Sequence, residues 1–198
     1  MVGDCGTKRA MEERAPQRRT SSRPRPRKPL DEKSLGALAL RYVERFSTTR
    51  HKLASYLQRK VRERGWEGAA APDLEGLAER FAALGYVDDA AYALAKARTL
   101  GQRGYGPRRL VDTLRVAGVA EEDGVAARDH ADSEAVDAAL RFAQRRRIGP
   151  FAAGVSDDPK ARDKAIGAML RAGHGFALVR AIVALSPGQD FDREQFAD

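Results

Sequence analysis

The sequence predicts an all-α protein: an elongated tandem array of three three-helix repeats behind a disordered basic N-terminal arm. Apolar residues recur at three- and four-residue steps from Leu35 onward, which is typical of amphipathic helices, and convincing strand patterns are missing. A self-similar pattern also recurs at positions 53, 110 and 166, which are 57 and 56 residues apart. The repeated pairs are Leu53 and Leu57, Leu110 and Leu114, and Ile166 and Leu170. A period of this length indicates stacked repeats that share contacts with their neighbours.

The arm is predicted over residues 1–33. This segment carries ten Lys or Arg against five Asp or Glu, is rich in Pro and Ser, and has almost no periodic apolar residues. Such a composition cannot bury enough apolar surface to offset the conformational entropy of ordering the chain. We expect it to remain disordered and to attract polyanions, although a merely solubilising segment is an equally good interpretation.

The first repeat is predicted over residues 34–85. Its first helix follows the apolar stripe from Leu35 to Phe46. Thr48 and Thr49 are good N-cap residues for a second helix, which we expect to end at Gly65. A third helix opens near Pro72 and ends at Gly85.

The second repeat is predicted over residues 86–131 and the third over residues 132–187. Asp88 and Asp89 are assigned to helix capping, Pro107 to the first turn of the next helix, and Gly118 to its end. In the third repeat, Asp158 and Pro159 open the middle helix and Pro187 stops the last one. The polar residues 188–198 are expected to form a frayed tail.

The charge of the chain points to an anionic partner. The net charge is +8 and the sequence pI about 9.9. The charge alternates in blocks, with a net of +6 over residues 41–64, −5 over 67–95, +5 over 96–115 and −6 over 119–140. Basic stripes of this kind suit nucleic acid or an acidic protein surface, whereas a solvated helical surface is the plainer interpretation of any single residue.

The sequence contains no recognisable catalytic or metal-binding constellation. His51, His130 and His174 fall in different repeats, and the one cysteine is Cys5. No P-loop or nucleophile elbow occurs. We therefore expect no enzymatic activity, no metal and no cofactor. The absence of a membrane-span pattern, of a secretory signal and of paired cysteines leads us to expect a cytoplasmic protein that does not use a membrane.

Two basic groups are the candidate binding residues. Those in the first repeat are Arg50, Lys52 and Arg59, and those in the second are Arg98, Arg103, Arg108 and Arg109, with Tyr105 among them as an anchor. Gly104 and Gly106 permit a tight connection before Pro107 starts a helix. Positive charge in that first turn opposes the helix dipole, so helix stability does not account for the two arginines at 108 and 109.

One stretch resembles a known family. Residues 84–119, LGYVDDAAYALAKARTLGQRGYGPRRLVDTLRVAGV, resemble the central signature of the RecX family of recombinase regulators, in which a Leu-Gly-Tyr and paired Asp precede a Gly-Tyr-Gly and a Leu-rich helix. Residues 39–60 resemble the opening repeat of that family. The resemblance covers roughly residues 36–185.

The resemblance implies a function. RecX proteins consist of tandem three-helix repeats, are cytoplasmic and need no cofactor. They bind filaments of the RecA recombinase on single-stranded DNA and mostly inhibit recombinase and coprotease activities, which regulates DNA repair and the SOS response. For this chain we expect the same partner, with single-stranded DNA as a potential direct one, and a monomer. The alternative is a helical protein that acts directly on duplex DNA.

Overall fold

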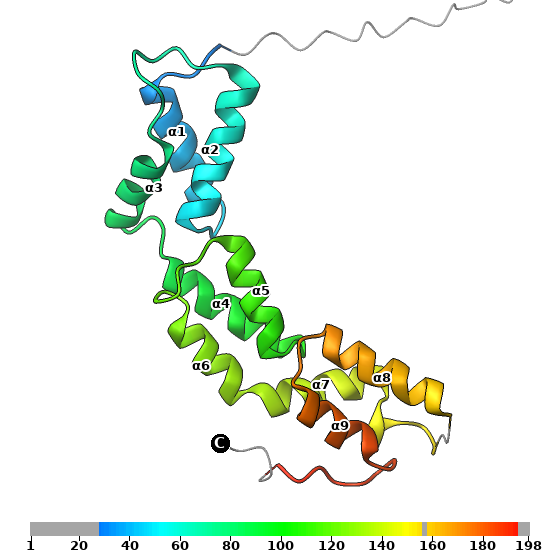
Figure 1. The fold of residues 1–198 in the computed structure, drawn as a ribbon. Coiled ribbons are helices and arrows are strands. Elements are labelled where there is room, and N and C mark those ends of the chain that lie inside the picture. The colour runs from blue at the N-terminus through cyan, green and yellow to red at the C-terminus, as the bar shows by residue number, and fades with distance from the viewer. Residues whose placement is uncertain (1–27, 156–157, 194–198) are drawn as a thin grey trace, which may run out of the picture.

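The computed structural model describes residues 28–155 and 158–193, which form a curved, elongated array of helices (Figure 1). Over these ranges the regular structure is helical, apart from an isolated parallel bridge between Leu30 and Trp66. The predicted all-α fold is confirmed. Within the same ranges no helix is long and apolar enough to cross a membrane.

Nine α-helices and one short 3-10 helix follow one another in the described residues, three α-helices to each repeat. The first repeat contains α1 (Glu32–Val43), α2 (Arg50–Arg64) and α3 (Leu74–Ala83). The second contains α4 (Asp89–Gln102), α5 (Pro107–Ala117) and α6 (Val125–Ser133). The third contains α7 (Ala135–Arg146), the 3-10 helix η1 (Gly149–Phe151), α8 (Pro159–Arg171) and α9 (Phe176–Ala184).

Each repeat has a small apolar core of its own. The first is built around the fully buried Leu53 and Leu57 of α2. The second is small because alanines of α4 and α6 pack against Leu110 and Leu114 of α5. The third gathers the larger side chains of α7, α8 and α9. The chain therefore buries three modest clusters along an arc instead of one central core, as repeat architectures do.

The middle helices of the repeats, α2, α5 and α8, follow one another along the inner side of the bend (Figure 1). The carbonyls of Ala172 and Gly173, just after α8, accept the N–H groups of Gly106 and Arg108 at 3.0 and 3.2 Å. The carbonyl of Ala117 at the end of α5 accepts the hydroxyl of Thr49, the N-cap of α2, at 2.6 Å. The three helices thus stack end to end, with the negative end of each dipole against the positive end of the next.

Two segments differ from the sequence-based expectation. Residues 28–33 belong to the predicted arm, yet Leu30 is fully buried in the first core and Asp31 caps α1. Residues 188–193 belong to the predicted frayed tail, yet Phe191 packs against the third core and Arg193 pairs with Asp137 of α7 at 2.5 Å. In both segments one apolar side chain anchors an otherwise polar stretch. Residues 1–27 and 194–198 lie outside the described residues.

Candidate partner-binding surface

The stretch GYG at residues 104–106 forms a joint between the second and third repeats. Gly104 has a φ of +70°, which favours glycine, and a Cβ there would lie 2.9 Å from the backbone nitrogen of Phe142. A Cβ on Gly106 would lie 2.4 Å from the carbonyl oxygen of Gly173. Because Gly106 has no side chain to cap α5, the carbonyls after α8 take over that role. The glycines therefore allow two backbones to meet.

A buried histidine completes this joint. His174 is fully buried, and its Nε2 lies 3.2 Å from the carbonyl oxygen of Gly104. Desolvation lowers the pKa of His174 to about 4, so the ring is neutral at pH 7. A neutral ring that bonds a carbonyl must carry its proton on Nε2. His174, which the sequence offered only as an isolated histidine, is therefore a structural donor between repeats.

The basic residues around this joint form what we call the α4–α5 corner, comprising Arg103, Tyr105, Arg108 and Arg109. The Tyr105 ring is half-buried against the third core, with the guanidinium carbons of Arg103 and Arg109 at 5.6 and 6.0 Å from its centroid. All three arginines are exposed. The structure brings these four predicted residues together and holds them on a well-defined backbone.

Arg50 occupies a different kind of position. Its guanidinium pairs with Asp89 at 3.2 Å, Asp123 at 2.5 Å and Glu79 at 3.4 Å, and its backbone N–H donates to the buried Asp89 carboxylate at 3.0 Å. Hydrogen bonding to Asp89 raises the pKa of Arg50 further above its already high value. Arg50 therefore holds the first repeat to the second, which leaves little of its charge for a partner.

The same network separates the roles of the two aspartates predicted to cap. Asp88 caps α4 by accepting the N–H of Ala91 at 2.8 Å. Asp89 is buried and instead accepts the first N–H of α2, which belongs to the preceding repeat. The assignment to capping describes Asp88 within its own helix, whereas Asp89 serves a helix that starts 39 residues earlier.

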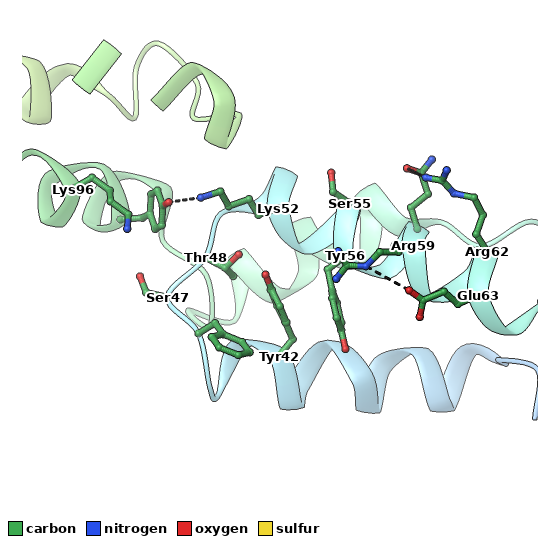
Figure 2. Close-up of a pocket in the computed structure, with 13 residues that line it drawn as sticks. Tyr42, Ser47, Thr48, Lys52, Ser55, Tyr56, Arg59, Arg62, Glu63 and Lys96 are labelled. Carbon is green, nitrogen blue, oxygen red and sulfur yellow. Dashed lines mark hydrogen bonds and ion pairs between the residues drawn. The ribbon is translucent and has the colours of Figure 1, made fainter. Parts of the chain in front are cut away.

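Lys52 and Arg59 line an open groove of about 900 Å³, which we call the aromatic groove. It lies beside α1, α2 and the start of α4 (Figure 2). Its lining residues are Tyr42, Phe46, Ser47, Thr48, Lys52, Ser55, Tyr56, Gln58, Arg59, Arg62, Glu63, Tyr92 and Lys96. The groove is thus a surface of aromatic rings and cations with one carboxylate.

Aromatic rings run through the groove as a connected series. Tyr42 and Tyr56 stack with centroids 4.1 Å apart and planes at 13°, and Phe46 leans on Tyr42 at 5.3 Å. At the α4 end, Lys52 donates a hydrogen bond to the Tyr92 hydroxyl, as Figure 2 shows. Phe46 remains half-exposed beside this series. Sequence reasoning assigned Tyr42, Phe46 and Tyr56 to the apolar helix face, so it missed their contribution to a surface.

The predicted residues therefore divide into separate groups. Lys52 contacts Tyr92 in the first turn of α4, whereas Arg103 is the C-cap of that helix. Eleven residues of α-helix put about 16 Å between these positions. Arg98 is exposed on α4 between them, and in the described part of the chain it forms no ion pair. The residues predicted from the sequence thus fall into the α4–α5 corner, the aromatic groove and Arg50, which joins two repeats, with Arg98 exposed between the first two groups.

The described residues contain no group of three or more His, Cys, Asp or Glu side chains that could hold a metal ion. The pKa of the buried His174 is lowered and that of the half-buried Arg50 is raised, and both residues lie at joints between repeats and not in a cleft. The candidate residues form an exposed corner and an open groove on a set of joined repeats, and such surfaces suit binding to a larger partner.

Comparison with known proteins gives a consistent result. The family model for the second three-helix domain of RecX matches residues 88–127. The chain is 31% identical over 157 residues to a regulatory protein RecX of Myxococcus xanthus, covering 75% of this chain and 83% of that protein. It is 35% identical over 154 residues to a regulatory protein RecX of Halorhodospira halophila, covering 77% and 88%.

Solved structures share the fold. A crystal structure of a regulatory protein RecX superposes with a TM-score of 0.54 at 19% identity, covering 76% of this chain and 70% of that chain. A RecX from Lactobacillus salivarius gives the same TM-score at 17% identity, covering 76% of this chain and 93% of that chain.

Proposed function

Because the chain belongs to the RecX family of regulatory proteins, we propose that it binds filaments of the RecA recombinase on single-stranded DNA and inhibits their recombinase and coprotease activities. Such a protein acts in the regulation of DNA repair and of the SOS response. We further propose that it works in the cytoplasm, as a monomer and without a cofactor.

The α4–α5 corner is the observation that carries this proposal. Its arginines are exposed, and the backbone beneath them is fixed by hydrogen bonds to the third repeat. A fixed backbone removes the cost of ordering a loop on binding, so only the arginine side chains lose freedom when they meet a partner. Positive charge of this kind attracts both the phosphates of DNA and acidic protein surfaces, and a RecA filament on DNA presents both kinds of surface. We assign the filament contact to Arg103, Tyr105, Arg108 and Arg109, with Arg98 beside them.

The alternative function, direct binding to duplex DNA, agrees less well with the geometry of the α4–α5 corner. In a helix-turn-helix protein the N-terminal residues of the recognition helix contact base edges in the major groove. Here the first turn of α5 is docked end to end against the carbonyls after α8. The helix end is covered by the third repeat although the Arg108 and Arg109 side chains are exposed, so α5 cannot enter a major groove end first unless the second and third repeats separate. Binding to duplex DNA alone with sequence preference would be the signature of this alternative.

The direct test is the DNA-dependent ATPase of RecA on single-stranded DNA, measured with substoichiometric amounts of this protein. We expect the protein to lower the steady-state rate. The double variant Arg108→Glu/Arg109→Glu should need at least about tenfold more protein for the same effect, because close like charges at an interface cost several kcal/mol. Its helix content by circular dichroism should equal that of the wild type.

A matched control separates this contact from a general loss of positive charge. Lys33→Glu/Arg41→Glu makes the same change in charge on exposed residues of α1, far from the corner. This variant should retain most of the inhibition. Equal losses in the two variants would remove the corner from the contact, and no effect of the wild-type protein on the ATPase would refute the proposed function.

A further inference from the structure

The aromatic groove of the first repeat has a composition that the α4–α5 corner does not explain. We propose that it binds single-stranded nucleic acid directly, with bases stacked on Phe46 beside Tyr42 and with phosphates held by Lys52, Arg59 and Lys96. This inference deepens the proposed function, on which it rests for its biological setting, by adding a second contact made with the strand itself.

The aromatic residues are placed as a stacking surface. Phe46 is 50% exposed, although an aromatic side chain of its size contributes most to stability when it is buried. The Tyr42 ring packs against the Phe46 ring with a centroid distance of 5.3 Å. The Tyr56 ring stacks on Tyr42 with a centroid distance of 4.1 Å. A ring held in this way can accept the face of any base, which is how proteins bind single strands with little sequence preference.

The cations flank this surface on both sides. Lys96 and Lys52 lie over the Tyr92 ring at 5.2 and 4.6 Å from its centroid, at the α4 end of the groove. Arg59 lies toward the other end, with 63% of its side chain exposed. Figure 2 shows the two groups on either side of Tyr42 and Tyr56. This spacing suits a chain of phosphates that passes along the rings.

A buried hydroxyl lies in the wall of the groove. Thr48 lines the groove with only 5% of its surface exposed. Its Oγ1 is buried and has no hydrogen-bond partner among the described residues, whereas most buried polar atoms are paired. Because this oxygen has almost no accessible surface, a ligand reaches it only if neighbouring side chains move, so the proposal rests on the rings and the cations.

The groove favours a single strand over other anions. Bases in a duplex are already stacked on one another and cannot offer their faces to Phe46. An acidic peptide would satisfy the cations but would leave the exposed ring without a planar partner. Glu63 is the one carboxylate among the lining residues, and it pairs with Lys60 at 2.5 Å and with Arg59 at 3.7 Å. Removing it should therefore free a cation for phosphate.

The test uses the full-length protein and a fluorescein-labelled oligothymidylate, with binding measured by fluorescence anisotropy in the absence of RecA. Phe46→Ala should weaken binding by about fivefold or more, the effect of losing one base–aromatic stack. Phe176→Ala is the matched control, because Phe176 is 53% exposed and has an arginine 5.8 Å from its ring, much as Phe46 has Arg45 at 5.7 Å. The control should bind like the wild type.

Salt dependence distinguishes phosphate contacts from stacking. Arg59→Gln should weaken binding and reduce the slope of log K against log salt by about 0.7, the contribution of one phosphate contact on a single strand. Phe46→Ala should leave that slope unchanged. Glu63→Gln should strengthen binding, because it removes the one negative charge from the lining and releases both Lys60 and Arg59.

Each other outcome overturns the proposal. Equal weakening by Phe46→Ala and Phe176→Ala, or wild-type binding by both Phe46→Ala and Arg59→Gln, would remove the groove from the site. If unlabelled duplex or polyglutamate competed as effectively as an unlabelled single strand, the groove would bind duplex DNA or an acidic peptide, and the proposed single strand would be wrong. These binding experiments use DNA without RecA, so they are independent of the ATPase assay. The groove proposal can be wrong while the protein still inhibits filaments, and the groove can bind DNA while the protein does not inhibit them.

Discussion

At the scale of single residues, charge alone does not separate arginines that join repeats from arginines that are left free to contact a partner. Arg50 and Arg108 both begin a helix in a basic stretch, and the sequence favoured both as contacts. Arg50 faces three carboxylates, from α3, from the start of α4 and from the loop after α5, whereas Arg108 forms no ion pair within the described residues. The nearest of those carboxylates in sequence is 29 residues away, so no local pattern could have revealed them.

His174 gives a prediction at the same scale. Its folded pKa of about 4 lies below the ordinary 6.5, so the unfolded chain takes up a proton first as the pH falls. The stability that the neutral ring contributes is therefore complete above pH 6.5 and is lost between pH 6.5 and pH 4, to a total of about 3 kcal/mol. Urea unfolding at a series of pH values measures this loss.

The variant His174→Gln is the control for that measurement. A glutamine amide can still donate to the Gly104 carbonyl but does not titrate. Because carboxylates titrate in both proteins, the difference between the two curves isolates the histidine. Parallel curves from pH 6.5 to pH 4 would show that His174 is accessible to protons in the folded state.

At the scale of elements, the apolar pattern predicted the middle helices well in the first two repeats. The pairs Leu53 and Leu57, and Leu110 and Leu114, are all buried, as a helical stripe requires. In α8 the fully buried residue is Met169, with Ile166 and Leu170 partly buried beside it. The most buried position of α8 thus lies 55 residues after Leu114, one residue short of the expected offset of 56.

The joints between repeats were beyond what the sequence could predict. The sequence predicted that Gly104 and Gly106 form a tight connection within the second repeat, and they lie between α4 and α5 as expected. What the pattern could not show is which distant backbone lies against them, that of Phe142 against Gly104 and that of Gly173 against Gly106. Helix periodicity reports which face of an element is apolar, but not which distant backbone will approach a glycine.

Two glycines five positions apart test this view of the joint. Gly106→Ala places a Cβ 2.4 Å from the Gly173 carbonyl oxygen and should lower the free energy of unfolding by about 1–3 kcal/mol through overpacking. Gly101→Ala lies within α4 with nothing inside 4 Å of the new Cβ, and should raise that free energy by about 0.5–1 kcal/mol through helix propensity. Urea denaturation measures both. Destabilisation of similar size in both would mean that the close approach at residue 106 is not tight.

At the scale of the whole molecule, the two joints of the arc differ in chemistry. The joint between the second and third repeats contains backbone hydrogen bonds and the neutral His174, with the Arg141 guanidinium donating to the Gly101 carbonyl beside them. The joint between the first and second repeats contains the ion pairs of Arg50 with Asp89 and with the partly exposed Asp123, beside the neutral bond from Thr49 to Ala117. Charge pairs that reach solvent weaken as salt is added, whereas bonds between neutral groups do not.

This difference predicts that salt loosens one joint and not the other. Hydrogen–deuterium exchange can follow the amide of Arg50, which donates to Asp89, and the amides of Gly106 and Arg108, which donate to carbonyls after α8. Raising salt from about 0.1 M to about 1 M shortens the Debye length from about 10 Å to about 3 Å. The Arg50 amide should then exchange several-fold faster, and the other two should be unchanged. Equal acceleration at both joints would mean that the repeats come apart together, and the arc would then behave as one cooperative unit instead of as modules joined by distinct chemistry.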